Sequence, residues 1–545
     1  MAEQHVTAYT ACCNAAGSVY NQVFGHRNPR MKRRQFLNAA SVLAVGGQVV
    51  ATRAQAQEAG DDVPIAQNDF GFEDVAAIAE DRATRVYTQP VAEQVGSFAD
   101  LNYDQYRGIR FRRELDPLEG RGGFALDLLP PGAIFYEPVN ISVVRDGVPQ
   151  KIGFDPHMLE FDPSQFPDGA DLDNTGDMGW SGFRLRTTLN KPGVMDEFLV
   201  FQGATYFRAV ARGTLYGLSG RGLAIKTGSP DGEEFPLFTD FWIHEPNAET
   251  AGTVRIHAIL DSKSVAGAYQ FDVSPGAVTM VRTRVALFPR IDLRETGIAP
   301  LTSMFWFSPA SRRTVDDYRP AVHDSDGLQM HTGAGQALWR SLSSPKNLQI
   351  ASFVDSNPRG FGLIQRKRRF EDYQDAEASY HLRPSAWIEP EGDWGEGEIR
   401  LVEIPVENEF NDNIVSYWVP KEPITKDKRR EFQYRLSFSS LPPSELPLAK
   451  IRQVRSGRSI NDETQRSYIV DFDLSLFSTE LPDSKVTTSK GKIVHAYLKQ
   501  LPEQQVLRLA FEFQPGNEQF ADIQAVLTGK DGIALSETWM TRWSA

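Results

Sequence analysis

Alternation of apolar and polar residues is the sequence feature that most constrains how this chain can fold. It occurs in three distant stretches, residues 254–259 (VRIHAI), 470–476 (VDFDLSL) and 507–513 (LRLAFEF). A strand with this pattern buries one face and leaves the other in water, which favours antiparallel sheets. Gly and Pro, 43 and 33 of the 545 residues, supply turns between such strands. The pattern therefore predicts an all-β fold.

One stretch has a different period. Residues 72–84 (FEDVAAIAEDRAT) place apolar side chains three and four positions apart, as on one face of a helix. These side chains are Phe72, Val75, Ala76, Ala79 and Ala83. We therefore expect a helix here, ahead of the strands.

Residues 1–56 have the features of an export signal. Residues 31–38 (MKRRQFLN) contain two adjacent arginines, a mildly apolar stretch follows, and residues 54–56 (AQA) form a small-residue cleavage site. We interpret this order as a twin-arginine signal, with Met31 as an alternative start of the chain. The apolar stretch is too short and too rich in glycine for a stable membrane span.

Charge and cysteine content exclude several classes of function. Residues 1–56 contain six basic residues and one acidic residue, so their removal changes the net charge from −13 to −18. So acidic a chain is a poor partner for the phosphates of nucleic acid. Removal also takes away Cys12 and Cys13, the only cysteines. The mature chain can therefore have no disulfide, thiol nucleophile or thiolate metal ligand.

The sequence lacks the common catalytic motifs. It has no P-loop and no HExxH, and residues 333–338 (GAGQAL) lack the third glycine of a dinucleotide loop. Residues 179–183 (GWSGF) and 217–221 (GLSGR) lack the closing glycine of a serine elbow. Residues 171–177 (DLDNTGD) begin like a calcium loop, but its twelfth position is Gly182 instead of Glu. The nucleotide-binding, zinc-protease and serine-esterase interpretations are therefore excluded.

A charged segment divides the chain. Residues 421–430 (KEPITKDKRR), which follow Pro420, are interpreted as a linker. The preceding block, residues 65–420, is too long for a small sandwich and predicts a large two-sheet β-domain. Residues 431–545 have the size of an immunoglobulin-like sandwich without its disulfide.

Carboxylates among aromatic side chains carry the functional signal that remains. Two acidic segments place carboxylates beside side chains that can form hydrogen bonds. They are residues 319–328 (RPAVHDSDGL) and 408–418 (NEFNDNIVSYW). Glycoside hydrolysis needs two carboxyl groups, one to protonate the leaving oxygen and one to activate water or attack. Asp324 and Asp412 are the candidates, with turn or capping roles as the alternative. A metal site formed by His323, Asp324 and Asp326 is a weaker interpretation.

Aromatic rings in polar surroundings are the second part of this signal. Rings cover the apolar faces of a sugar while neighbouring polar groups bind its hydroxyls. Trp306, Tyr380 and Trp387 are of this kind. For any one ring, a place in the hydrophobic core is the alternative interpretation.

Several motifs across nearly the whole mature chain resemble those of the osmoregulated periplasmic glucan biosynthesis proteins, types G and D. They are residues 101–111 (LNYDQYRGIRF), 201–208 (FQGATYFR), 216–224 (YGLSGRGLA), 299–305 (APLTSMF), 323–325 (HDS), 383–387 (RPSAW) and 535–539 (LSETW). The twin-arginine signal makes the chain most similar to the D type.

The resemblance implies both a fold and an activity. The fold is a large N-terminal β-sandwich similar to galactose mutarotase, followed by a small immunoglobulin-like sandwich. D-type members are similar to inverting endo-β-1,2-glucanases, which act in the periplasm on linear β-1,2-glucan. By position, the general acid falls on Asp412 and the general base on Asp324, 88 residues earlier. The expected substrate-binding residues are Tyr380, Arg383, His323, Trp387 and Trp306.

Two alternatives stay open. One is a non-catalytic or very slow glucan-binding accessory protein, because the family name describes a biosynthetic phenotype. The other is an epimerase or mutarotase, which rests on fold analogy alone. Mutarotases typically use His and Glu, whereas the best-placed pair here is two Asp. The sequence is compatible with a homodimer and leaves the glucan length open.

Overall fold

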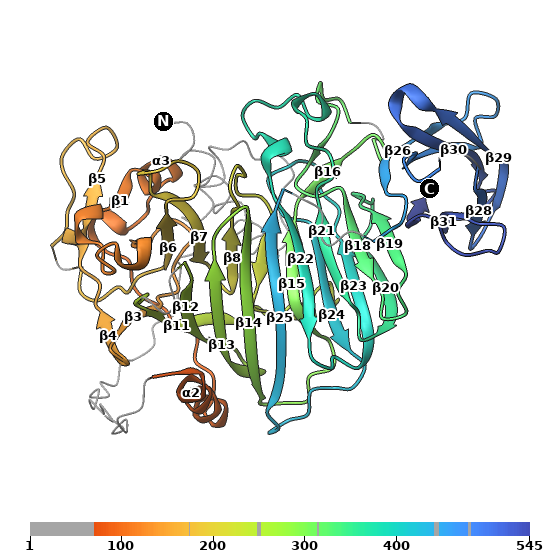
Figure 1. Cartoon of the computed structure of the whole chain (residues 1–545). Helices are drawn as coiled ribbons and strands as arrows, with labels where there is room; N and C mark the ends of the chain where they lie inside the picture. The colour runs from red at the N-terminus through yellow and green to blue at the C-terminus, as the bar shows by residue number, and fades with distance from the viewer. Residues whose placement is uncertain (1–69, 174, 248–251, 313–314, 441–445, 478–480) are drawn as a thin grey trace, which may run out of the picture.

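The computed structural model describes residues 70–545 except 174, 248–251, 313–314, 441–445 and 478–480. Strands dominate these residues (Figure 1), which confirms the predicted all-β fold. The expected export signal, residues 1–56, lies outside the described residues. Among the helices of the described ranges, none is long and apolar enough to cross a membrane.

The predicted helix is present. α2 (Phe72–Thr84) has the expected bounds and buries Phe72, Val75, Ala76 and Ala79. These side chains pack against Ile259, Ala268 and Ala286 on three neighbouring strands of the larger sheet. A second, short helix, α3 (Tyr103–Arg107), precedes a small two-stranded sheet of β1 (Ile109–Phe111) and β5 (Leu159–Phe161).

Two large sheets form the main body. The first has ten strands, in the order β2 (Phe124–Leu129), β6 (Gly182–Thr187), β7 (Asp196–Gln202), β8 (Tyr206–Ala209), β9 (Ser219–Arg221), β15 (Thr296–Ser303), β24 (Ile414–Pro420), β23 (Glu396–Glu403) and β20 (Gln349–Ser356), with β10 (Leu223–Ile225) also paired to β15. The neighbours along this path run antiparallel, as the alternation predicts.

The second sheet has fourteen strands. Their order is β28 (Asp483–Thr488), β31 (Phe520–Thr528), β32 (Thr538–Ser544), β19 (Ala337–Ser341), β18 (Gly327–His331), β21 (Gly360–Ile364), β22 (Ser385–Glu391), β25 (Arg430–Ser439), β14 (Val278–Pro289), β13 (Val265–Ser274), β12 (Val254–Asp261), β11 (Leu237–His244), β3 (Asn140–Arg145) and β4 (Val148–Ile152). Two of its pairs, β11 with β3 and β19 with β32, are parallel.

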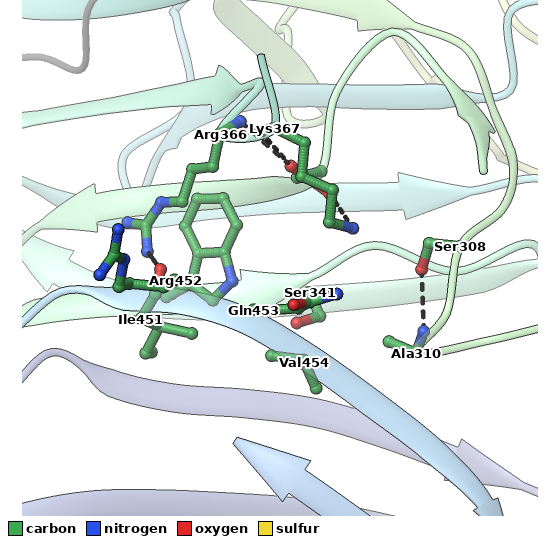
Figure 2. Close-up of a pocket in the computed structure, with 11 residues that line it drawn as sticks. Ser308, Ala310, Ser341, Arg366, Lys367, Ile451, Arg452, Gln453 and Val454 are labelled. Carbon is green, nitrogen blue, oxygen red and sulfur yellow. Dashed lines mark hydrogen bonds and ion pairs between the residues drawn. The ribbon is translucent and has the colours of Figure 1, made fainter. Parts of the chain in front are cut away.

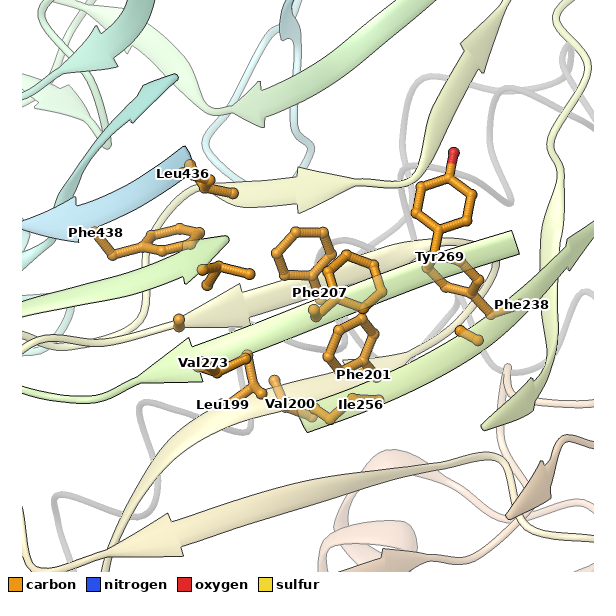
Figure 3. Packing of buried hydrophobic residues seen from close by; sticks show 14 of the residues in the cluster. Leu199, Val200, Phe201, Phe207, Phe238, Ile256, Tyr269, Val273, Leu436 and Phe438 are labelled. Atoms are coloured by element: carbon orange, nitrogen blue, oxygen red, sulfur yellow. The ribbon is translucent and has the colours of Figure 1, made fainter. Parts of the chain in front are cut away.

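The inner faces of the two sheets pack on each other through aromatic side chains (Figure 3). Phe201 of the ten-stranded sheet lies with its ring centroid 5.4 Å from that of Phe241 and 5.2 Å from that of Phe271. Both partners belong to the fourteen-stranded sheet. Rings at these separations add to the free energy of apolar burial, so this layer holds the two sheets together as a sandwich.

The second module begins later than the sequence predicts. β25, the first strand after the expected linker 421–430, lies between β14 and β22 in the large sheet. The expected boundaries at 420 and 431 therefore differ from the observed pairing. The reason is physical: a charged, proline-containing segment marks a turn, but it does not specify which sheet the next strand joins.

The C-terminal module is a small sandwich with its own core. One layer is a four-stranded sheet of β26 (Ile451–Arg458), β27 (Arg466–Asp473), β30 (Val506–Gln514) and β29 (Lys492–Leu501). The other layer is the end of the fourteen-stranded sheet, β28, β31 and β32. Buried residues of both layers, among them Val470, Leu509 and Ile523, form one cluster.

A seam of polar contacts joins this module to the main body (Figure 2). The Arg366 guanidinium lies 3.5 Å from the ring centroid of Trp339 and donates hydrogen bonds to both carboxylate oxygens of Glu537, each at 2.7 Å. It also donates to the Ile451 carbonyl at 2.6 Å. Glu537 accepts a further bond from the Ile451 amide at 2.9 Å. The seam is therefore built around one buried ion pair.

Candidate functional site

The candidate site is organised by the point where β15, a strand of the ten-stranded sheet, passes into β16 of a small two-stranded sheet. β15 ends at Ser303, and β16 (Phe305–Phe307) follows after Met304. Ser303 pairs with Ile414, the first residue of β24, and Phe305 pairs with His323 in β17 (Val322–His323). Asp412 lies just before β24 and Asp324 just after β17. The fold therefore brings both predicted carboxylates to the junction between β15 and β16.

Backbone contacts fix each carboxylate there. The Asp324 amide donates to the Met304 carbonyl at 2.8 Å. On the other side, the Asn413 amide donates to the Ser303 carbonyl at 3.0 Å. The Asn413 side chain accepts from the Phe305 amide at 2.8 Å and donates to the Phe305 carbonyl at 3.0 Å. Asn413 thus holds the backbone next to Asp412 against β16.

Asp412 has the electrostatic character of an acid. Only 7% of the residue is exposed. Burial raises its pKa from 3.8 to about 6, with the charge of Asp324 acting in the same direction and those of Arg208 and Arg383 opposing it. An Arg208 Nη atom lies 3.5 Å from the Asp412 carboxylate, and Arg208 Nε donates to Ser219 Oγ at 2.7 Å.

Asp324 has a different partner. It is 2% exposed and accepts a hydrogen bond from the Arg383 guanidinium, which forms an ion pair with it. Arg383 also lies over the Tyr380 ring, 4.3 Å from its centroid. Gly217 makes room for this arrangement, because a Cβ atom there would lie 2.9 Å from Arg383 Cβ. The Asp324 carboxylate is therefore held by a positively charged side chain in this conformation.

The segment that carries Tyr380 and Arg383 is anchored by a cluster that we call the clasp: Arg319, Asp317, Asp375 and Glu409. An Arg319 Nη atom donates to Asp375 at 2.6 Å, and the other lies 2.6 Å from Glu409 and 2.9 Å from Asp317. Asp375 also accepts from the Glu377 amide at 3.0 Å. Since Glu409 precedes Asp412 by three residues, the clasp ties the segment before η7 (Tyr380–Leu382) to the segment that positions Asp412.

The predicted substrate-binding residues do not all come together at the carboxylates. Tyr380 is buried, and the partly buried Trp306 packs in the same cluster. Trp387 belongs instead to the core of the C-terminal module, where its ring centroid lies 4.9 Å from that of His331. For Trp387 the core interpretation is therefore the one that the structure supports.

His323, predicted to bind substrate, is fully buried beside Asp324. Its ring stacks on Phe305 at 5.3 Å and contacts Tyr373 edge-on at 5.2 Å. Burial lowers its pKa to about 4, against the opposing charge of Asp326. His323 is therefore a neutral packing residue beside Asp324 in this conformation, and its contact with substrate stays a prediction.

Sequence reasoning missed the partners of the carboxylates. Arg208, Asn413 and Arg319 all lie within segments that the sequence analysis singled out, so the sequence indicated the segments that contain them. Their roles were not, because Arg208 and Asp412 are 204 residues apart in the chain. Among the described residues, no three His, Cys, Asp or Glu side chains converge in a way that could hold a metal ion.

The fold and the site together define an all-β protein of two modules with an asymmetric pair of buried carboxylates. The chain belongs to the family described as "Periplasmic glucan biosynthesis protein, MdoG", whose model matches residues 70–543. This agrees with the resemblance found in the motifs. The finer likeness to the D type rests on the export signal and stays a prediction.

Curated relatives support the same membership. The chain is 40% identical over 482 residues to "Glucans biosynthesis protein G" of Vibrio cholerae serotype O1 (strain ATCC 39541), with 87% of each chain covered. It is 40% identical over 484 residues to the protein of that name from Shewanella frigidimarina, covering 87% of this chain and 85% of the relative. "Glucans biosynthesis protein G 1" of Shewanella oneidensis is 40% identical over 482 residues, with 87% of each covered.

Proposed function

We propose that this protein is a periplasmic glycoside hydrolase that cleaves linear β-1,2-glucan with inversion and so takes part in the biosynthesis of periplasmic glucans. The family membership supports the glucan role. The observation that carries the hydrolase role is the contrast between the two carboxylates. Asp412 has its pKa raised to about 6 by burial, whereas Asp324 is paired with a guanidinium.

This contrast assigns the two roles. A carboxyl that stays protonated near neutral pH is suited to protonate the glycosidic oxygen, so Asp412 is the general acid. The second carboxylate of an inverting pair accepts a proton from the water that attacks the anomeric carbon, so Asp324 is the general base. In the inverting reaction the water proton goes to Asp324, the Asp412 proton goes to the leaving oxygen, and one C–O bond replaces another. No cofactor enters this reaction.

The segment before η7 has to move for a glucan chain to enter. Both carboxylates are almost fully buried, and the Arg383 guanidinium is bound to Asp324. Entry of substrate therefore has to displace Arg383 from Asp324, after which its guanidinium and the Tyr380 ring are available to bind the sugar. Trp306, packed in the same cluster, is the further ring expected to line this path.

The same burial favours a second candidate function. If the clasp does not release the segment, the protein binds glucan elsewhere and acts as a non-catalytic or very slow accessory protein in glucan biosynthesis. The names of the relatives describe biosynthesis and mention no hydrolysis.

Product release from linear β-1,2-glucan tests these two functions. The protein without residues 1–56 is incubated with the glucan. NMR follows the oligosaccharide products and the configuration of the new reducing end. We expect short products with inverted configuration, and a loss of at least about 100-fold in kcat for Asp412→Asn and for Asp324→Asn. Asp162→Asn is the matched control, because Asp162 lies outside the candidate site and the hydrogen bonds of its carboxylate stay within its own turn, to Ser164.

The outcomes separate the candidates. Hydrolysis by the wild type and by Asp162→Asn, with loss in Asp412→Asn and Asp324→Asn, supports the glycosidase. A wild-type protein that binds the glucan without product release supports the accessory function. Hydrolysis by all three variants refutes the assignment of both carboxylates.

A further inference from the structure

The ten-stranded sheet ends in a long strand whose outer edge is paired with no other strand of the described residues. β20 (Gln349–Ser356) pairs with β23 along all eight of its residues and closes the strand order of this sheet. Among the described residues, no strand pairs with its other edge. An edge of this length presents a row of backbone donors and acceptors that another strand can bind.

The side chains of this edge are also unusual for the protein. Val354 is 84% exposed and Ile350 is 39% exposed, and both lie on the same face as the exposed Ser352. Natural edges are commonly protected by charges, prolines or bulges. β20 has no proline and one charged residue, Asp355, in a chain that is 24% charged. β20 therefore carries little charge, although the protein as a whole is strongly acidic.

The sequence of β20 is complementary to itself in one antiparallel register. With Ser352 on a twofold axis, Ile350 faces Val354 of the second copy, and Gln349 faces Asp355. Exposed residues then meet exposed residues, and the half-buried Ala351 meets the half-buried Phe353. Other antiparallel registers also place exposed residues opposite exposed residues. Only this one sets Ile350 opposite Val354, which is a favourable cross-strand pair of β-branched side chains. It also keeps the two Asp355 carboxylates apart.

We propose that β20 is the interface through which two copies of this chain form a symmetric dimer. The ten-stranded sheets of the two copies join edge to edge, with Ser352 next to its own counterpart. A twofold contact of this kind uses the same strand on both copies and closes on itself.

Disulfide trapping tests the register. In Ser352→Cys, the two introduced thiols lie directly opposite each other, so mild oxidation links two chains. Ser356→Cys is the control on the same strand, because its counterpart lies eight residues away along the strand, about 26 Å. We expect a covalent dimer for Ser352→Cys, with two copies of the peptide around position 352 joined by a disulfide in mass spectrometry. For Ser356→Cys we expect monomer on a non-reducing gel.

Light scattering of the exported protein tests the interface itself. We expect twice the chain mass for the wild type and a single chain mass for Val354→Lys, because the register sets the added charge against apolar Ile350. Val194→Lys is the matched control, since Val194 is 46% exposed on another surface. Circular dichroism and melting temperature show that each variant is folded.

Each result decides the proposal. A monomeric wild type overturns it. So does a dimer that persists in Val354→Lys, or Ser356→Cys forming the covalent link as readily as Ser352→Cys. Loss of the dimer in Val354→Lys alone, with trapping at position 352, establishes the interface.

Discussion

Two aspartates of the same chemistry acquire different properties from their surroundings. Asp412 keeps its proton up to a pH of about 6 because burial raises its pKa, whereas in the unfolded chain it loses the proton near pH 4. Its contribution to stability is therefore fully present below pH 4 and is lost as the pH rises through 6. At 1.36 kcal/mol per unit, the loss is about 3 kcal/mol.

This linkage predicts how Asp412→Asn changes stability with pH. Because asparagine does not ionise, the variant is not destabilised by a buried charge as the pH rises. We expect its free energy of unfolding, relative to the wild type, to increase by about 2–3 kcal/mol between pH 4 and pH 7.5, as measured by urea titration. His323 titrates in the same range but is present in both proteins, so its effect cancels. A difference that does not vary with pH contradicts the raised pKa.

Arg208 predicts a second effect at the scale of one residue. Its charge opposes the rise in the pKa of Asp412, as does that of Arg383, while Asp324 acts in the opposite direction. Arg208→Met should therefore move the alkaline limb of the kcat profile for β-1,2-glucan to higher pH, by about one unit. Arg208→Lys retains the charge and should restore most of the wild-type profile. An unchanged limb in Arg208→Met would show that Arg208 has only a structural role.

At the scale of elements, the clasp controls the segment before η7. Arg319 is the one guanidinium that contacts Asp375 and Glu409 together among the described residues, and it is itself buried. Arg319→Met leaves three carboxylates, those of Asp317, Asp375 and Glu409, without this partner, and loss of a buried partner typically costs about 3–5 kcal/mol. We expect the backbone amides of residues 374–383 to lose at least about tenfold of their protection in hydrogen exchange measured by mass spectrometry.

Arg369→Met is the control for the clasp. Arg369 lies in the same part of the chain but is exposed and pairs with Asp372 only three residues away. Exposed pairs of this kind contribute about 0–1 kcal/mol. Its exchange pattern should match that of the wild type, and equal loss of protection in both variants would argue against a specific role of Arg319.

The same scale shows what the sequence could and could not predict. Local periodicity predicted α2 and the strands β12 and β30, because the alternation of side chains reflects burial directly. It could not assign β25 to the large sheet, since pairing partners far apart in sequence leave no local pattern. Asp324 and Asp412 were predicted from the chemistry of their neighbours, but the partners Arg208 and Arg383 required the fold. The burial of Trp387 in a hydrophobic cluster could not be predicted either, because a buried ring and a binding ring look alike in sequence.

At the scale of the whole molecule, the fourteen-stranded sheet runs through both modules. The parallel pair of β19 and β32 carries it from the main body into the C-terminal module. The buried ion pair of Arg366 and Glu537 lies beside this crossing, with Arg366 on Trp339. We therefore expect the two modules to unfold together, in one calorimetric transition.

Glu537→Gln tests that coupling. The substitution preserves shape but leaves the Arg366 guanidinium without its counter-charge, which should destabilise the seam by about 3 kcal/mol and split the transition in two. Glu518→Gln is the control, because Glu518 pairs at 3.3 Å with Lys490 on the exposed surface of the same module. Two transitions in the wild type would show that the continuous sheet and the ion pair together do not couple the modules. A single transition in Glu537→Gln would show that the sheet suffices without the ion pair, because the backbone ladder of β19 and β32 is intact in both proteins.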